Sequence, residues 1–394
     1  MRGWLVLAAM VLLAGCVRIV PAVSPTRPIA APPPVVATAA LAGLVRGPDI
    51  ASLGVARGDA GAALTSFLES CPKLLARKDA SGLTAPEDWR PACDAGRGWP
   101  VGDARRFFAT YFEAVRVGDG AAFATGYFEP EISGSRSRAP GYDVPVYKLP
   151  EDLVRAWPAE TPQSERSGRP PLGRYDAEGK FVPYFERAEI EDGALAGRGL
   201  EIAWAADPVE FFFLQIQGSG LLRLPDGSLM RIGYAGQNGR EYVGIGSVMR
   251  ERGLLGEGPG KYPGSMQGIV QYIRDHPVEG RELMRRNKSW IFFREPAGDG
   301  PLGALEVPVR REASVAVDPN FVPLGAPVFL DLDRDEADGL WIAQDTGGAI
   351  KGANRFDTFW GNGPDARVIA GGMSGRGAAL VLLPRGTLAR LRPQ

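Results

Sequence analysis

Three aspartates in the C-terminal third of the chain stand where carboxylates could take part in acid–base chemistry. Asp318 ends the apolar run 315–317, and Asp345 ends the run 341–344 just before a Thr-Gly-Gly turn. Asp357 follows twelve residues after Asp345. A carboxyl group at the end of a strand is held rigidly and partly removed from water, which suits a general acid. On spacing alone, aspartates that only accept hydrogen bonds from turn amides are the commoner case.

Asp357 differs from the other two in its aromatic surroundings. Phe356, Phe359 and Trp360 lie within three residues of it. Apolar neighbours raise the pKa of a carboxyl group and keep its proton available for donation. Aromatic side chains beside acids also suit the apolar faces of sugar rings. These neighbours favour a catalytic acid that acts on a carbohydrate.

The composition excludes several other kinds of chemistry. The 394 residues include one histidine and three cysteines, so multi-histidine metal sites and zinc sites built from paired Cys-x-x-Cys motifs are excluded. A net charge of −1 gives no field that attracts nucleic acid. His276 is predicted to cap a helix or to lie on the surface. The acidic run 331–338 is predicted to form a solvated turn, because its spacing does not match a calcium-binding EF-hand loop. The Gly-rich run 347–352 is not a phosphate-binding loop, because it lacks the Gly-Lys-Ser/Thr ending. We expect no cofactor and no metal.

The N-terminus is typical of an exported protein. Residues 4–14 are apolar, too few for a membrane-spanning helix, and they end in Leu-Ala-Gly-Cys, which resembles the lipobox of bacterial lipoproteins. The resemblance implies a signal peptide at 1–15, lipidation of Cys16 and, since Val17 is not aspartate, the outer membrane. Residues 16–40, rich in proline, are predicted to form a lipid-anchored tether. The alternative is an ordinary secretory signal with an incidental cysteine.

The two remaining cysteines form a candidate disulfide. Cys71 and Cys93 are the only pair left once Cys16 is acylated, and the periplasm is oxidising. Closing so short a loop would stabilise the fold by about 3 kcal/mol. Two separate buried thiols are the alternative.

The pattern of apolar residues predicts helices first and short strands afterwards. Helices are expected at 63–75, from Asp103 through a buried stripe at 107–115, and from Ser265 and Pro277. Strands are expected at 144–149 on a sheet edge, at 211–217, in a hairpin at 221–232, and at 289–293, 314–317, 328–332, 340–344 and 378–383. Many short strands separated by Gly, Pro and Asp indicate a small barrel, and the chain is long enough for two domains.

The three aspartates lie in motifs that resemble a known family. The segments Val-Asp-Pro at 317–319, Gln-Asp-Thr-Gly-Gly-Ala-Ile-Lys-Gly at 344–352 and Arg-Phe-Asp at 355–357 are similar to the three-aspartate (3D) domain of membrane-bound lytic murein transglycosylase A. Segments 124–130, 213–220 and 233–239 also resemble that family and follow in the same order. The resemblance spans about residues 125–375.

The resemblance implies a mainly β fold with some α structure. A double-psi β-barrel domain would comprise 41–130 and 286–394, with the 3D motif at 314–375. An inserted β-rich, glycan-binding domain would comprise 131–285, and a groove for glycan would run between the two.

The resemblance also implies a reaction. Asp357 would be the catalytic acid and base, supported by Asp345 and Asp318. Asp357 would protonate the bond between N-acetylmuramic acid and N-acetylglucosamine, then deprotonate the 6-hydroxyl of the muramic residue to form a 1,6-anhydro ring. The expected partners are peptidoglycan strands, the outer membrane on its periplasmic face in a Gram-negative cell, and complexes with other cell-wall enzymes. Substrate contacts are expected from motif residues Gly126, Tyr127, Phe128, Glu129, Gln215, Gln217, Gly218, Ser219, Gln237 and Lys351.

Two other functions stay open at this point. A hydrolase would use Asp345 as a base opposite Asp357, with the two carboxyl groups about 6.5–9.5 Å apart. An expansin-like lipoprotein would bind the wall without cleaving it.

Overall fold

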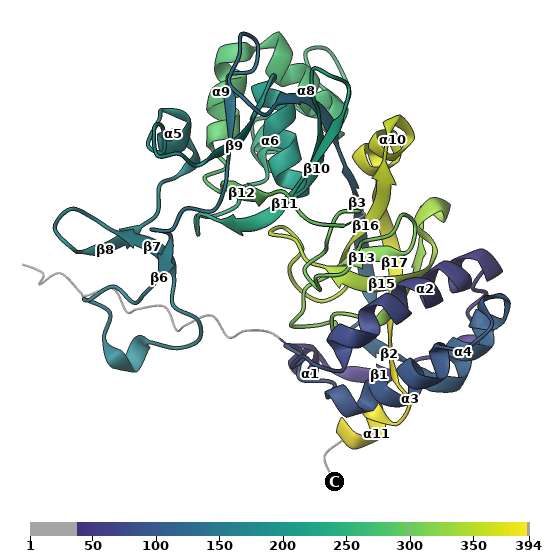
Figure 1. Cartoon of the computed structure of the whole chain (residues 1–394). Coiled ribbons are helices and arrows are strands. Elements are labelled where there is room, and N and C mark those ends of the chain that lie inside the picture. Colours follow the sequence, from purple (N-terminus) through teal and green to yellow (C-terminus); the bar gives the residue numbers. More distant parts are fainter. Residues whose placement is uncertain (1–37, 299, 392–394) are drawn as a thin grey trace, which may run out of the picture. The chain divides into compact units, whose positions relative to one another are not determined.

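The strands around the three aspartates form a sheet that closes on itself. The computed structural model describes residues 38–298 and 300–391, within a unit that spans 37–394 (Figure 1). The closed ring contains, in order of pairing, β3 (Ala121–Glu129), β17 (Ser374–Pro384), β14 (Pro327–Leu332), β15 (Gly339–Asp345), β13 (Ser314–Ala316) and β16 (Arg355–Asn362), which pairs again with β3. The pairs β13–β15 and β16–β3 are parallel. A closed ring of mixed strands is consistent with the predicted double-psi barrel.

Short strands and helices from both ends of the chain complete this domain. β2 (Phe112–Val117) pairs with β17, and β1 (Leu44–Arg46) pairs with β2. The helices of this domain are α1 (Ala39–Ala42), α2 (Arg57–Leu74), α3 (Pro86–Gly96), α4 (Ala104–Tyr111), α10 (Pro364–Gly372) and α11 (Thr387–Leu391). Apolar side chains of α2–α4 join those of the barrel strands in one core. Helix α2 packs on β15, the strand that ends in Asp345.

The chain between β3 and β13 builds a second sheet with its own core. Its strands, in order of pairing, are β12 (Ile291–Arg294), β11 (Leu229–Gln237), β10 (Gly220–Arg223), β4 (Glu131–Ser135), β9 (Glu201–Ala205) and β5 (Val144–Tyr147). Its helices are α5 (Arg187–Glu191), α6 (Pro208–Gln217), α7 (Ile245–Glu251), α8 (Met266–Asp275) and α9 (Pro277–Arg285). A small sheet of β6 (Val154–Arg155), β7 (Leu172–Tyr175) and β8 (Phe181–Pro183) adjoins them in the chain.

These pairings change one predicted domain boundary. The switch from β3 to β4 at Pro130 lies at the predicted end of the first barrel segment. The predicted return to the barrel at residue 286 is one strand too early, because β12 pairs with β11 and its phenylalanines lie in the second core. The inserted sheet therefore extends to Arg294.

Two secondary-structure predictions are wrong for identifiable reasons. The segment 211–217 is helical, because the Asp207 carboxylate caps the backbone N–H groups of Val209 and Glu210 and Gly218 ends α6 with φ of 83°. The predicted helix at 107–115 stops at Tyr111, and the chain continues as β2, whose residues pair with β17. In both cases the apolar spacing of a short run does not distinguish a strand from a helix.

The predicted signal peptide, Cys16 and the tether up to residue 37 lie outside the described residues. The described residues begin at Thr38, which caps α1 and lies two residues before the predicted end of the tether. In the part of the chain that the structure describes, no helix is long and apolar enough to cross a membrane.

Candidate active site

Strand register brings Asp345 and Asp357 to the same face of the barrel. Ala316 of the short strand β13 pairs with Asp345 on one side and with Asp357 on the other. Residues paired across neighbouring strands point to the same face, so both carboxyl groups flank Ala316, with their Cα atoms roughly 10 Å apart at the usual strand spacing. On its other side Asp357 pairs with Thr125 of β3.

Asp357 is half-buried and held by one short hydrogen bond. The Thr125 hydroxyl donates to Asp357 Oδ1 at 2.6 Å. Burial raises the pKa of Asp357 to about 6, the charge of Asp345 acts in the same direction, and the Thr125 bond and the charge of Arg355 oppose them. A carboxyl group with this pKa can hold and release a proton near neutral pH.

A small apolar cluster lies on this face of the barrel. Its members are Tyr127, Val309, Ala316, Ile350 and Phe359. Of the three aromatic neighbours expected around Asp357, only Phe359 lies here. Phe356 and Trp360 belong to the main barrel core, because side chains alternate between the two faces of β16 and adjacent residues cannot share one.

Asp345 accepts three hydrogen bonds. Its Oδ1 accepts from the backbone N–H groups of Ala304 (2.9 Å) and Thr346 (2.8 Å), and its Oδ2 accepts from the Tyr127 hydroxyl (3.0 Å). Burial raises the pKa of Asp345, and these three hydrogen bonds act against that rise. Asp345 thus ties the loop before β13 and the turn after β15 to Tyr127 of β3.

Asp318 is deeply buried and fastens two turns. Its Oδ1 accepts from the backbone N–H and the side-chain amide of Asn320, both at 3.0 Å, and its Oδ2 accepts from the backbone N–H of Gly352 at 2.8 Å. Gly352 follows Lys351, whose side chain is exposed. The structure therefore brings Asp345 and Asp357 together on one face and places Asp318 in the supporting turns.

The predicted substrate-binding residues of β3 lie in different surroundings. Gly126 faces α10, where an added Cβ would lie 2.9 Å from Ala370 Cα. Tyr127 points to Asp345, and Phe128 lies on the opposite face of β3. Glu129 is only 1% exposed and pairs with Arg231 at 2.8 Å, so it is a structural ion pair and direct substrate contact is not expected.

The predicted amides of the second motif also separate. Gln215 is 2% exposed, and its side-chain oxygen accepts from Arg187, so it is an interior residue, contrary to the predicted groove role. Gln217 is half-buried at the end of α6 and accepts from the backbone N–H of Phe128 at 3.0 Å. Gly218 is the cap that ends α6, Ser219 follows it half-buried, and Gln237 is half-buried at the end of β11.

A cavity of about 280 Å³ lies where the barrel and the inserted domain meet. Its walls combine residues of β3, β4, α6, α8 and α10: Phe128, Pro130, Glu131, Ile132, Val209, Glu210, Phe213, Gln217, Met266, Val270, Gly363, Pro364 and Arg367. Since Phe128 faces away from Tyr127, this cavity and the two aspartates lie on opposite sides of β3.

Sequence reasoning missed three residues of the site. Thr125 and Arg355 lie inside the quoted motifs but were given no role, and Tyr242 lies outside them. The phenol of Tyr242 interacts electrostatically with Asp357, and its Cβ would lie 3.6 Å from a Cβ added at Gly348. The alternation of Thr125 with Tyr127 was a usable signal, but the pairing of β3 with β16 cannot be inferred from local sequence.

Comparison with known proteins identifies relatives over most of the chain. The model of the MltA specific insert domain matches residues 123–294, and the model of the 3D domain matches residues 313–383. The membrane-bound lytic murein transglycosylase A of Vibrio cholerae is 31% identical over 300 residues, which cover 72% of this chain and 73% of the relative.

Solved structures extend the similarity to the fold. A membrane-bound lytic murein transglycosylase from Agrobacterium tumefaciens superposes with a TM-score of 0.78 at 30% identity, over 89% of this chain and 99% of the other. The Escherichia coli MltA structure with bound chitohexaose superposes with a TM-score of 0.60 at 28% identity, over 87% and 94%. The predicted mainly β fold class is thereby confirmed.

Proposed function

The chain belongs to the membrane-bound lytic murein transglycosylase A family and is a peptidoglycan lytic transglycosylase, and we propose that Asp357 is the single acid and base of its reaction. The observation that carries this proposal is the setting of Asp357. It is half-buried beside an apolar cluster, bonded through one oxygen, and its pKa is raised to about 6.

One carboxyl group suffices when the substrate supplies the nucleophile. Protonated Asp357 donates its proton to the glycosidic oxygen as that bond breaks and positive charge develops on the anomeric carbon of N-acetylmuramic acid. The resulting carboxylate then takes the proton of the 6-hydroxyl of the same sugar as its oxygen bonds the anomeric carbon. The products are a free 4-hydroxyl on the leaving sugar and a 1,6-anhydro ring, and Asp357 ends protonated as it began.

The surroundings of Asp345 support a positioning role. A base that activates water needs a carboxylate oxygen free to accept the water proton. Oδ1 of Asp345 already accepts two hydrogen bonds, from Ala304 and Thr346, and its Oδ2 accepts one from Tyr127, so only one acceptor position is left for a water. This arrangement favours the transglycosylase over a hydrolase in which Asp345 activates water. Asp318, bonded to Asn320 and Gly352, is proposed to act one step further away, by holding the turn next to Lys351.

Glycan contacts are proposed for accessible residues of the predicted set. Peptidoglycan is the substrate, and the E. coli relative that binds chitohexaose supports recognition of an N-acetylated sugar chain. Ser219, Gln237 and Lys351 have half-buried or exposed polar side chains that can bond acetamido and hydroxyl groups. Gln217 lines the cavity on the other side of β3 and is proposed to contact glycan there through its amide nitrogen, because its oxygen accepts from the backbone N–H of Phe128.

The location is proposed from the N-terminal sequence and the relatives. The relatives are named membrane-bound. A lipid on Cys16 would hold the chain at the periplasmic face of the outer membrane, within reach of peptidoglycan, with residues up to 37 as the tether. At that surface the enzyme would meet other cell-wall enzymes, with which complexes are proposed.

Analysis of reaction products tests the proposed function. Purified sacculi are digested with the enzyme and the soluble fragments are examined by mass spectrometry. We expect fragments that end in 1,6-anhydromuramic acid, 18 Da lighter than hydrated reducing ends because no water is added (a mass fixed by the loss of one H₂O). Hydrated ends would instead identify a hydrolase, and the absence of soluble fragments would identify a binding protein.

A further inference from the structure

The hydrogen bonds around Thr125 run in one direction. Arg355 Nη2 donates to the Thr125 hydroxyl oxygen at 2.9 Å, and a guanidinium group has no acceptor to offer in return. The single hydrogen of the hydroxyl is therefore free to point at Asp357 Oδ1, 2.6 Å away. The chain of donors is Arg355 to Thr125 to Asp357.

Arg355 is itself held in place. Its Nη1 donates to the carbonyl oxygen of Phe356, and its guanidinium group lies 4.8 Å from the centre of the Phe123 ring. Arg376 of β17 lies over the same ring, also at 4.8 Å. Arg355 is half-buried between these contacts. Neighbouring strands therefore fix its position relative to Thr125.

We propose that Thr125 and Arg355 are positioning residues that direct a hydrogen bond to Asp357 Oδ1 and so keep the acidic proton on Oδ2, facing the substrate. The inference rests on the proposed function, in which Asp357 is the acid. When neutral, a carboxyl oxygen that accepts the Thr125 hydrogen is the carbonyl oxygen, and the other carries the proton. The same bond also stabilises the carboxylate formed after donation.

We call the donor chain from Arg355 through Thr125 to Asp357 the relay. Its effect on the pKa of Asp357 opposes that of other groups that face this carboxyl group. Burial disfavours the charged form of Asp357 most, and the like charge of Asp345 of β15 adds to that effect, whereas Arg355 of β16 is the opposing positive charge. Tyr127 of β3 and Tyr242 before α7 are neutral phenols whose pKa is raised by burial and by Asp357 itself. Thr125 and Arg355 are thus the groups around Asp357 that favour its ionised form.

The pH dependence of activity in variants tests the relay. Thr125→Val removes the hydroxyl with little change of shape. Without this hydrogen bond the carboxylate is less stable, so the alkaline limb of the pH profile of kcat/KM for anhydromuropeptide release should move up by ~1–2 pH units. This shift corresponds to the free energy of one hydrogen bond to a charged group. We also expect kcat on the acid side to fall by about tenfold, since the carboxyl orientation is lost. Thr125→Ser should restore both.

Arginine variants supply the matched control. Arg355→Met should move the limb in the same direction as Thr125→Val, and Arg355→Lys less far because the charge remains. Arg376→Met removes a cation from the same Phe123 ring without removing a donor to Thr125, and should leave the limb in place. If Thr125→Val does not fold, the difference between the Arg355 variants and Arg376→Met tests the relay instead.

Three results would overturn the relay, and they are distinguishable. A folded Thr125→Val enzyme with an unmoved limb, beside an inactive Asp357→Asn enzyme, contradicts the relay alone. An active Asp357→Asn enzyme contradicts the proposed function and the relay with it. Equal shifts of the alkaline limb in Arg355→Met and Arg376→Met would mean that the loss of any nearby positive charge causes the shift, which would also contradict the relay.

Discussion

At the scale of single residues, opposing effects on the pKa of Asp357 decide whether it can act as the acid. Burial and Asp345 raise its pKa, and Thr125 and Arg355 lower it, with a resulting pKa of about 6. A group that must give up a proton and then take one back works best when its pKa lies close to the working pH. In the proposed reaction Asp357 meets that requirement alone, because its two functions would use the two states of the same carboxyl group.

The pH profile of the wild-type enzyme follows from this pKa. The first step needs protonated Asp357, so kcat/KM should fall about tenfold per pH unit above pH 6. Anhydromuropeptide release from sacculi, measured between pH 4 and pH 9, checks this expectation. A rate that rises steadily through pH 8 would be incompatible with Asp357 as the acid.

The contribution of Asp357 to wild-type stability should fall as pH rises, the opposite of an aspartate whose pKa is lowered by folding. The folded pKa of about 6 exceeds the usual value of 3.8, so the folded state binds an extra proton between these values. Wild-type stability from this group therefore decreases as pH rises from 4 to 6 and stays lower above it. Asparagine does not titrate, so the variant should gain up to about 3 kcal/mol relative to wild type between pH 4 and pH 7.

Thermal melting of both proteins at these two pH values measures that difference. Thr110→Val, a change to an exposed hydroxyl on α4, serves as the control, and its difference from wild type should be the same at both. An Asp357→Asn difference that is also independent of pH would show that the carboxyl group is not held neutral by the fold.

Sequence reasoning selected Asp357, the proposed acid, but did not predict its surroundings. The motif and the aromatic neighbours of Asp357 pointed to a raised pKa, and the structure agrees. The neighbours themselves were partly wrong, since Phe356 and Trp360 face the barrel core. The face on which these two side chains lie depends on β16 being a strand, and the sequence does not predict that strand. Tyr127 and Ile350 reach the site only through strand pairing.

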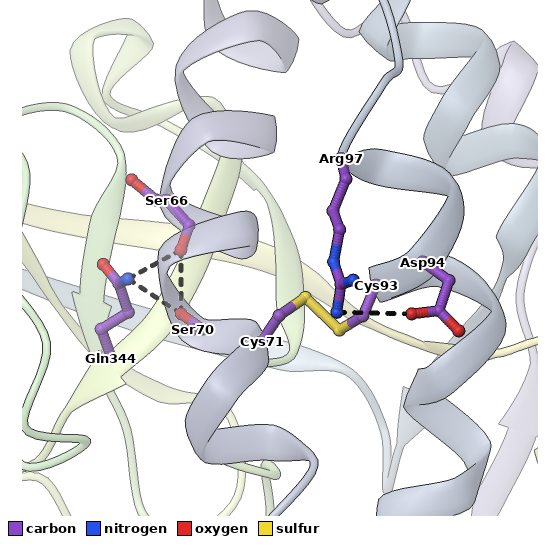
Figure 2. Close-up of a disulfide and its surroundings, with 7 residues drawn as sticks. All are labelled: Ser66, Ser70, Cys71, Cys93, Asp94, Arg97 and Gln344. Atoms are coloured by element: carbon purple, nitrogen blue, oxygen red, sulfur yellow. Dashed lines mark hydrogen bonds and ion pairs between the residues drawn. A yellow bond between two sulfur atoms is a disulfide. The ribbon is translucent and has the colours of Figure 1, made fainter.

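At the scale of the elements, α2 braces the strand that carries Asp345. Gln344, the residue before Asp345, is fully buried, and its amide nitrogen donates to Ser66 O and Ser70 Oγ of α2, both at 2.9 Å (Figure 2). One residue beyond Ser70, Cys71 forms a disulfide with Cys93 of α3. The helix pair is thereby linked to the end of β15.

Removal of this disulfide should weaken the barrel domain. The bridge closes a separation of 22 residues, so Cys71→Ala with Cys93→Ala should cost about 3 kcal/mol of unfolding free energy. Denaturant unfolding of the double variant and of wild type, each with and without reductant, measures the loss. Reductant should destabilise only wild type, and an equal effect on both would mean that the cysteines are not bridged in the exported protein.

Helix α6 shows where element prediction from one sequence is weakest. The run 211–217 contains three consecutive phenylalanines and reads as a buried strand when taken alone. The signals that decide for a helix stand outside it, in the Asp207-Pro208 start and the Gly218 stop. The hairpin of β10 and β11 was predicted correctly because its turn, Pro225-Asp226-Gly227, lies within the pattern itself.

At the scale of the whole molecule, we propose that a lipid on Cys16 anchors the catalytic unit to the membrane. On this proposal, Cys16→Ala should leave the signal peptide uncleaved or the protein away from the outer membrane. Fractionation of cells that express either form, with an antibody to the folded domain, checks the outcome. Unchanged outer-membrane recovery of Cys16→Ala would contradict the lipoprotein assignment but leave the catalytic account intact.

The central claim is that one aspartate, Asp357, performs both proton transfers. Its most direct test compares anhydromuropeptide release from sacculi by wild type, Asp357→Asn and Asp345→Asn, each shown by thermal melting to be folded. We predict that Asp357→Asn loses at least about 10²-fold in rate, since asparagine can neither donate nor accept the proton, while Asp345→Asn loses activity together with stability. An active Asp357→Asn enzyme beside a folded, inactive Asp345→Asn enzyme would contradict the account and make Asp345 the acid.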